Sequence, residues 1–204
     1  MDITTSMNPY LVQVQQNLLN IINKIILECP GIDLNIGFIG FRDVTHTESY
    51  VNLEFTQNHE ELKNSINNVY TSKGDDGNEE DIEEGIEMAL KKDWKSNARF
   101  AILVTDFPCH GIKYSLNTHD IYPNGNPNRR NIEVLINELA EHQISLFCIK
   151  VTSYTDKMFE IFNTIYNSYE KCKFKVIPLK SETNFTQVVV ESSADIYMNQ
   201  RNIN

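Results

Sequence analysis

Apolar residues recur along this chain with two alternating periods, one typical of helices and one typical of strands. Over residues 9–29 they stand three and four positions apart, which predicts a core-facing helix that ends at Pro30-Gly31. Further helices are predicted over 58–69, 79–92, 129–142, 155–169 and 184–198. Strands are predicted over 34–42, 51–55, 100–104, 144–151 and 174–177. Asn58 and Thr155 are predicted to cap the helices that follow them.

This order of strands and helices predicts a single α/β domain over residues 1–204, with 199–204 as a disordered tail. The expected architecture is Rossmann-like: a mostly parallel central sheet with helices on both faces and one antiparallel edge strand. The strict alternation over 51–55 is typical of such an edge strand. In sheets of this kind, ligands bind outside the carboxyl ends of the strands.

Composition and charge narrow the class of protein. Hydrophobic residues make up 41% and charged residues 23%, as in a globular domain, and no apolar run reaches the roughly 18 residues needed to span a membrane. The net charge of −10 argues against a nucleic-acid partner, because phosphate binding calls for a basic face. The four cysteines lack metal-ligand spacing, so buried thiols and a cytoplasmic location are expected.

The first residues carry the clearest candidate chemistry. Asp2, Thr4 and Ser6 occupy alternate positions, so their oxygens can lie on one side of a loop and share a hard cation such as Mg²⁺. The alternative interpretation is that Ser6 or Asn8 caps a helix whose first position is Pro9. Taken alone, the motif favours the cap.

Two later segments shift that balance toward a cation site. The acidic turn 74–81 precedes a predicted helix, and Asp106 directly follows the buried strand 100–104. Both should lie at the same sheet edge as the start of the chain. The stretch 107–128 is long for a loop inside a compact domain, and loops of that length are usually functional.

In this combination the motifs resemble the von Willebrand factor A domain and its metal-ion-dependent adhesion site. The first motif of that site, Asp-x-Ser/Thr-x-Ser, matches Asp2, Thr4 and Ser6, and its last ligand matches Asp106. The turn 74–81 stands where the family's middle loop would lie. The resemblance covers nearly the whole chain and implies metal-dependent protein binding without catalysis.

The resemblance is closest to the subgroup of these domains found beside alpha-type protein kinases. It is carried by segment 106–111, Asp-Phe-Pro-Cys-His-Gly, and by segments 120–125 and 155–158. These 204 residues contain no alpha-kinase catalytic domain, so the resemblance implies no kinase activity. The alternative function is that of a regulatory fragment of an alpha-kinase-like protein.

The resemblance also implies a set of site residues. The expected metal ligands are Asp2, Thr4, Ser6, Glu80 and Asp106, holding Mg²⁺, with Mn²⁺ or Ca²⁺ as alternatives. The middle loop has no Thr, so its ligand is open among Asp76, Glu80 and Asp81, of which Glu80 is favoured. An acidic side chain of the partner would complete the metal shell. Partner contacts are expected at Asp76, Phe107, His110 and Tyr122.

The family pattern has a central strand before its first motif, whereas only Met1 precedes Asp2 in this chain. The first central strand is therefore expected to be missing and the chain to be truncated at its start. Removing such a strand exposes apolar faces and unpaired backbone groups on both neighbours. The isolated polypeptide is expected to be unstable or to recruit a strand from another chain.

A third hypothesis is a Mg²⁺-dependent, phosphatase-like hydrolase in which Asp2 is the nucleophile of an Asp-x-Asp motif. Thr4 stands in place of the second acid, so the general acid that this chemistry needs is lacking. This hypothesis is therefore the least favoured of the three.

Overall fold

The computed structural model describes residues 1–45, 50–71, 79–115 and 120–179. In chain order its elements are η1 (Thr5–Met7), α1 (Leu11–Glu28), β1 (Ile36–Gly40), β2 (Val51–Thr56), α2 (His59–Asn67), α3 (Ile82–Leu90), β3 (Phe100–Thr105), α4 (Ile132–Glu141), β4 (Ser145–Lys150), η2 (Ser153–Thr155), α5 (Asp156–Tyr166) and β5 (Phe174–Pro178). Here η denotes a 3₁₀ helix. The predicted helix 184–198 and tail 199–204 lie outside the described residues.

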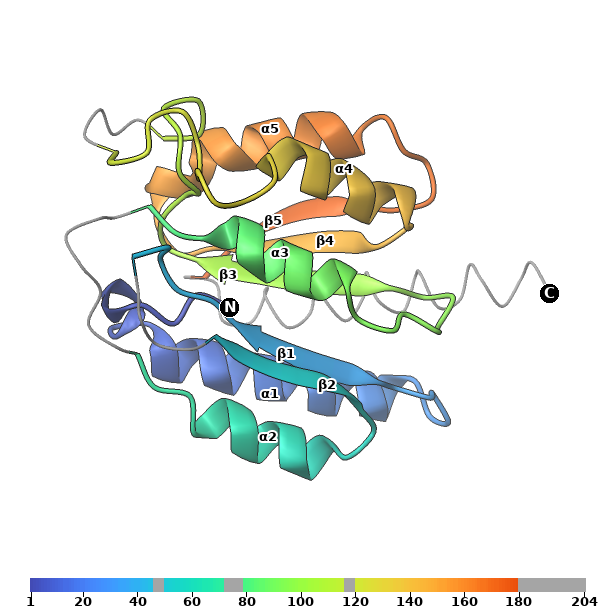
Figure 1. Ribbon diagram of the computed structural model, residues 1–204. Coiled ribbons are helices and arrows are strands. Elements are labelled where there is room, and N and C mark those ends of the chain that lie inside the picture. Colours follow the sequence, from blue (N-terminus) through green and yellow to red (C-terminus); the bar gives the residue numbers. More distant parts are fainter. Residues whose placement is uncertain (46–49, 72–78, 116–119, 180–204) are drawn as a thin grey trace.

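The strands form two groups (Figure 1). β3, β4 and β5 make a parallel sheet, and β1 and β2 make an antiparallel pair. The start of the chain lies between them, because Asp2 pairs in parallel with Phe41 and donates its N–H to the Val104 carbonyl at 2.8 Å. The order is therefore β2, β1, the first residues, β3, β4, β5. The predicted α/β architecture, with β2 as its antiparallel edge strand, is confirmed.

Helices cover both faces of this arrangement, with α1 and α2 on one side and α3, α4 and α5 on the other (Figure 1). Successive side chains of a strand point to opposite faces. Val104 of β3 accordingly joins the core shared with α1 and α2, whereas Leu103 joins the core shared with α3, α4 and α5. The continuous apolar run in β3 thus reflects burial on both faces. Among the described residues, no helix is long and apolar enough to cross a membrane.

The turn before α1 corrects one prediction. α1 begins at Leu11, with Tyr10 at its N-cap and no side chain accepting a hydrogen bond there. The interpretation of Ser6 or Asn8 as the cap of this helix is therefore wrong. Ser6 lies within the short helix η1, ahead of α1, and its hydroxyl bonds to Asp106 instead.

The two predicted caps farther along the chain have different outcomes. Asn58 caps α2 as predicted, since its side chain accepts the N–H of Glu61 at 3.2 Å. Thr155 occupies the N-cap position of α5 but makes no side-chain cap there. Its hydroxyl instead donates to the carbonyl of Thr152 at 3.2 Å, because the 3₁₀ turn η2 precedes the helix directly.

Candidate functional site

Backbone hydrogen bonds hold Asp2 where two strands end. Its flanking residues pair with Phe41, directly after β1, and its own N–H bonds to Val104 near the end of β3. The Asp2 side chain is fully buried. Its Oδ1 accepts both the backbone N–H and the hydroxyl of Thr4, at 2.8 Å each.

The hydroxyls of Thr4 and Ser6 connect the acids of this region. Thr4 Oγ1 lies 3.0 Å from both Ser6 Oγ and Glu80 Oε1, in addition to its contact with Asp2. Ser6 Oγ donates to Asp106 Oδ1 at 3.1 Å. A hydroxyl has a single proton to donate, so Thr4 cannot satisfy all the acceptors within its reach.

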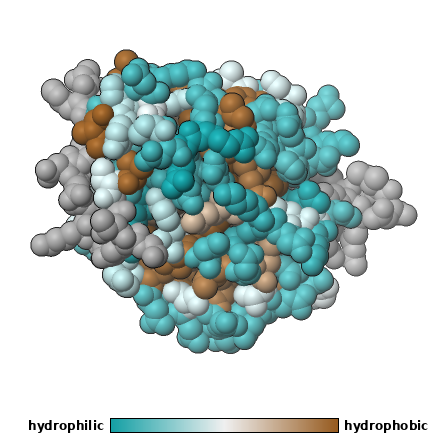
Figure 2. All heavy atoms as spheres, viewed as in Figure 1, coloured by the Kyte–Doolittle hydropathy of each residue, from teal (hydrophilic) through white to brown (hydrophobic). Residues whose placement is uncertain are grey.

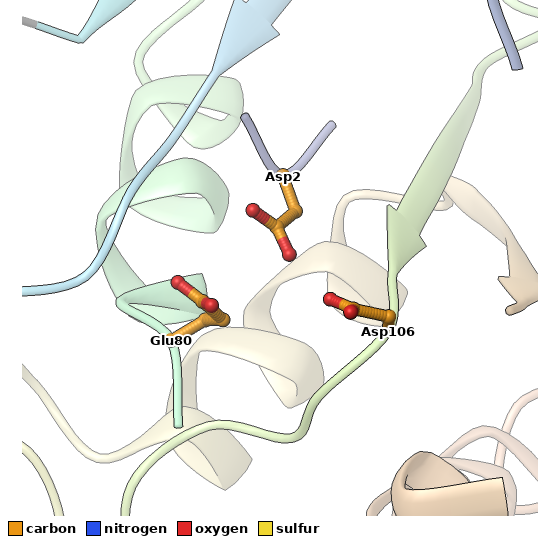
Figure 3. Close-up of side chains that lie close together, drawn as sticks. All are labelled: Asp2, Glu80 and Asp106. Atoms are coloured by element: carbon orange, nitrogen blue, oxygen red, sulfur yellow. The ribbon is translucent and has the colours of Figure 1, made fainter. Parts of the chain in front are cut away.

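The carboxylates of Asp2, Glu80 and Asp106 point toward one another from three separate segments (Figure 3). One oxygen from each lies within 4.8 Å of those of the other two. All three residues are buried, with at most 3% of their surface exposed. The second oxygen of Glu80, Oε2, is buried and has no hydrogen-bond partner among the described residues.

Burial raises the pKa of all three carboxyls, and repulsion by neighbouring acids adds to the effect at Asp2 and Glu80. Burial, followed by the charge of Asp106, raises the pKa of Asp2 from 3.8 to about 8. Burial and then the charge of Asp2 raise the pKa of Glu80 well above its ordinary value, and burial raises that of Asp106. The hydrogen bonds therefore compensate this negative charge incompletely, and a cation would relieve it. Carboxylate and hydroxyl oxygens are the ligands that hard cations such as Mg²⁺ prefer.

Of the three acids considered for the middle loop, the structure places Glu80 in this cluster. Its backbone N–H donates to the Pro108 carbonyl at 2.9 Å, which fixes it beside the segment that follows β3. Asp81 instead caps α3 by accepting the N–H of Glu84 at 3.0 Å. Asp76 lies outside the described residues.

The other residues predicted for a partner face lie in different surroundings. Phe107 directly follows Asp106 and stacks on the exposed ring of Tyr154, with centroids 4.7 Å apart. Tyr122 is partly exposed and meets the His110 ring edge-on at 5.0 Å. His110 itself is fully buried, so we expect it to hold this loop rather than to contact a partner.

Sequence analysis missed the buried network around His110. Its Nε2 lies 2.9 Å from Asp43 Oδ1, and its Nδ1 lies 2.8 Å from Asp120 Oδ1. Burial alone lowers the pKa of this imidazole, but the hydrogen bonds to Asp43 and Asp120 outweigh burial and raise it to about 9. Asp43 follows the end of β1, so the rule that sites gather at strand ends could have drawn attention to it.

Comparison with known proteins identifies the family. A model of the von Willebrand factor type A domain matches residues 1–188. The chain belongs to the von Willebrand factor type A (VWA) family. The resemblance noted from the sequence motifs is therefore confirmed, and the matched region of the VWA domain contains the whole acidic cluster.

One relative also supports the resemblance to the VWA domains found beside alpha-type protein kinases. The alpha-protein kinase vwkA of Dictyostelium discoideum is 26% identical to this chain over 148 residues, which is 72% of the chain. The chain spans 23% of the length of that relative.

Solved structures share the VWA fold at low sequence identity. The VWA domain of SpRpn10 has a TM-score of 0.58 and 14% identity, with 90% of each chain covered. The pilus adhesin SpaC from Lactobacillus rhamnosus GG has a TM-score of 0.64 and 12% identity, covering 94% of this chain and 29% of SpaC. The vWF domain of the type V pili tip protein Mfa5 from Porphyromonas gingivalis has a TM-score of 0.58 and 12% identity, covering 94% and 92%. These likenesses establish the fold alone.

Proposed function

We propose that this VWA domain binds a protein partner through a divalent cation and that it does so without catalysis. The proposed ligands are Asp2, Thr4, Ser6, Glu80 and Asp106, and the proposed ion is Mg²⁺, with Mn²⁺ or Ca²⁺ as alternatives. The four cysteines are free thiols, which is compatible with the reducing cytoplasm proposed as its location.

The observation that most supports a cation is the unpartnered oxygen of Glu80. A buried acceptor left without a hydrogen bond costs about 1–3 kcal/mol, and more when it is charged. Here that oxygen belongs to a group of three buried carboxylates whose pKa values are all raised. A divalent ion would give Glu80 a partner and would offset the repulsion among the three acids at the same time.

The ligand set also supports a site that accepts a further oxygen from a partner. Mg²⁺, when bound, supplies a Lewis acid that usually keeps positions for water or for a ligand from another molecule. Thr4 and Ser6 contribute oxygens without charge, which keeps the ion electrophilic, whereas Glu80 makes the site more negative than a Thr would. We expect this combination to favour tight metal binding and a weaker attraction for the acidic side chain of a partner.

The proposed partner face borders this site. Phe107, stacked on Tyr154, stands directly after Asp106, and Tyr122 lies in the loop 107–128 that would frame the contact. Asp76 is also proposed to contact the partner, because it belongs to the acidic turn 74–81.

Calorimetric titration with MgCl₂ tests the cation. The native chain is expected to bind one ion per molecule, and Asp106→Asn is expected to weaken binding about 10- to 100-fold because it removes a charged ligand while keeping the side-chain size. Asp93→Asn is the matched control, since Asp93 is exposed and outside the cluster. Equal affinity in the native chain and in Asp106→Asn would remove Asp106 from the site and refute the proposal.

The likeness to vwkA favours a second candidate, a regulatory part of an alpha-kinase-like protein. Co-purification of the chain with an alpha-type kinase, or a kinase domain in the same reading frame, would support it.

The hydrolase hypothesis gains no support from the site, because the Thr4 hydroxyl that replaces the second acid is committed to hydrogen bonds with its neighbours. Turnover of a phosphate ester by metal-loaded protein would revive it.

A further inference from the structure

An exposed aromatic ring stands at the same sheet edge as the acidic cluster. Tyr154 lies in η2, shortly after β4, and 54% of its surface is exposed. Its ring stacks on that of Phe107, with centroids 4.7 Å apart and planes 10° from parallel. Phe107 therefore covers one face of the ring, and the exposure belongs to the opposite face and the edge. A large ring held in one orientation in this way is already ordered for contact with another molecule.

The turn that carries Tyr154 is attached to the backbone of Asp106. The hydroxyl of Thr152 donates to the Asp106 carbonyl, and the N–H of Tyr154 donates to the same hydroxyl oxygen at 3.3 Å. β3 and β4 are adjacent and parallel, so Asp106 and Thr152 follow their carboxyl ends side by side. A further contact, from the Thr155 hydroxyl to the Thr152 carbonyl at 3.2 Å, closes the turn. The aromatic ring and the proposed metal ligand are thus held by one support.

Large apolar side chains are exposed on the loop that follows Phe107. Ile112 and Ile121 are 55% and 52% exposed. The Ile112 carbonyl accepts a hydrogen bond from Lys157 Nζ, in the first turn of α5, at 2.8 Å, which places Ile112 near the helix end that η2 precedes. Figure 2 shows hydrophobic atoms at the upper left, on the side where Figure 1 places the loop between β3 and α4 and the start of α5. Exposed apolar surface at a site of this kind is suited to an apolar side chain of a partner.

We propose that Tyr154, supported by Phe107, determines which acidic segment of a partner polypeptide this domain binds. The inference rests on the proposed cation function: the acid of the partner reaches the ion, and an aromatic residue beside that acid lies on the exposed face of Tyr154. A third ring placed there extends the existing stack. A carboxylate alone does not distinguish one acidic segment from another, since each offers the ion the same oxygen. The ring contact supplies that distinction.

An aromatic companion fits this surface better than a cationic one. A guanidinium can also lie on a tyrosine ring, and the net charge of −10 would attract it. That attraction acts at any acidic part of the surface, however, whereas the exposed isoleucines near Tyr154 add contact area for an apolar companion. The aromatic residue is therefore the proposed occupant, and an arginine is the alternative that the experiment distinguishes.

Synthetic peptides with an N-terminal trifluoroacetyl group test the proposal by fluorine NMR, which follows weak binding without an aromatic label. They are Gly-Phe-Glu-Phe-Gly, Gly-Ser-Glu-Ser-Gly and Gly-Phe-Gln-Phe-Gly, each amidated at the carboxyl terminus so that glutamate supplies the only carboxylate. In MgCl₂ the native chain is expected to bind the Phe-Glu-Phe peptide about tenfold more tightly than the Ser-Glu-Ser peptide. Removal of the ion with EDTA, or of the carboxylate in the Phe-Gln-Phe peptide, is expected to abolish binding.

Variants of the ring separate a direct contact from a structural role. Tyr154→Ala is expected to bind the Phe-Glu-Phe peptide no more tightly than the Ser-Glu-Ser peptide, with the affinity for the latter and for Mg²⁺ unchanged. Tyr154→Phe keeps the ring and should retain the preference. Phe107→Leu removes the stacked support and should reduce the preference, which gives a second test in case Tyr154→Ala does not fold. Leu27→Ala is the matched control, because it removes an exposed apolar side chain at the far end of α1.

Amide hydrogen exchange locates the bound peptide. Slower exchange is expected over residues 152–155, with no change in β1. A cavity lies between β1 and β3, and Trp94 stands in its wall beyond the end of α3, where its indole N–H donates to the Ala89 carbonyl at 2.8 Å. Protection of β1 without protection of residues 152–155 would place the peptide in that cavity and overturn the proposal.

Failure of this proposal can be told apart from failure of the cation function. Equal, Mg²⁺-dependent binding of the two Glu peptides, or no binding of either by Mg²⁺-loaded protein, would overturn the role of Tyr154 and leave the cation site standing. A preference that persists in Tyr154→Ala, or equal binding of the Phe-Gln-Phe peptide, would also overturn it. Tighter binding of Gly-Arg-Glu-Arg-Gly that is lost in Tyr154→Ala would assign the ring to a cation instead. Absence of Mg²⁺ binding in the calorimetric titration would refute the cation function itself and this inference with it.

Discussion

His110 lies between two carboxylates, and the free energy of unfolding depends on its charge. Its pKa is raised from 6.5 to about 9 by hydrogen bonds to Asp43 and Asp120, against the effect of burial. A histidine with a raised pKa stabilises the folded state fully below its ordinary pKa, and this contribution is lost as the pH rises through the raised value. The shift corresponds to a contribution on the order of 3 kcal/mol at pH 6.

Replacement of this imidazole gives a test at the residue scale. His110→Gln is expected to lower the free energy of unfolding by about 3–5 kcal/mol at pH 6, because it leaves two buried carboxylates without their cation. The difference from the native chain should shrink as the pH rises past 9. Urea unfolding at a series of pH values measures it, with His142→Gln at the exposed end of α4 as the control. A difference that grows with pH would contradict the assignment.

Some of the site residues could be anticipated from the sequence, and others could not. Asp2 and Asp106 were predicted to lie close together because both stand where strands of a parallel sheet end, and the structure places them so. The contact between His110 and Asp43 joins residues 67 positions apart. Neither hydrophobic period nor motif spacing encodes such a contact, because it depends on how two loops fold over the sheet edge.

At the scale of elements, α3 packs on Phe41, the residue whose backbone bonds to the start of the chain. A Cβ added at Gly85 of α3 would stand 2.7 Å from Cδ1 of Phe41, closer than carbon atoms can approach. Phe41 is itself buried and bonds through its backbone to Met1 and Ile3. We therefore expect a shift of its ring to displace the backbone that carries Asp2.

Gly85→Ala tests this packing. Alanine favours a helix interior over glycine by about 0.5–1 kcal/mol, but the clash with Phe41 is expected to cost more, for a net loss of about 1–3 kcal/mol. Displacement of the start of the chain should also weaken Mg²⁺ binding. Thermal unfolding and calorimetry measure the two effects, and Asn64→Ala on the exposed face of α2 is the control. A more stable Gly85→Ala with unchanged Mg²⁺ affinity would show that Phe41 does not transmit the shift.

Element types were predictable because hydrophobic period differs between helix and strand, and the continuous run of β3 indicated burial on both faces. The start of α1 was not predictable in this way. Pro9 and its polar neighbours favour a helix start, but the chain makes a 3₁₀ turn there, and Ser6 bonds to Asp106 across the sheet edge. A tertiary hydrogen bond thus replaced the local cap that the sequence indicated.

At the scale of the whole molecule, the net charge of −10 disfavours the compact state through self-repulsion. Salt weakens this repulsion, since the Debye length falls to about 10 Å at 0.1 M ionic strength. A divalent ion at the acidic cluster would act differently, by binding to the folded state alone. The two effects can be separated because only the second depends on particular side chains.

Thermal unfolding in KCl and in MgCl₂ at equal ionic strength separates them. KCl is expected to raise the melting temperature of the native chain and of Asp106→Asn by the same amount. MgCl₂ is expected to raise that of the native chain further, by the equivalent of about 2.7 kcal/mol when the ion is present at one hundred times its dissociation constant. Equal stabilisation of the native chain by both salts would indicate screening without a specific site.

The position of Trp94 has a practical consequence. It is the only indole in the chain, and it stands in the wall of the cavity between β1 and β3. Its emission spectrum therefore reports the polarity of that one place, free of background from other tryptophans. A less polar environment at this wall would shift the emission to shorter wavelengths, so the unlabelled protein provides its own optical signal for changes there.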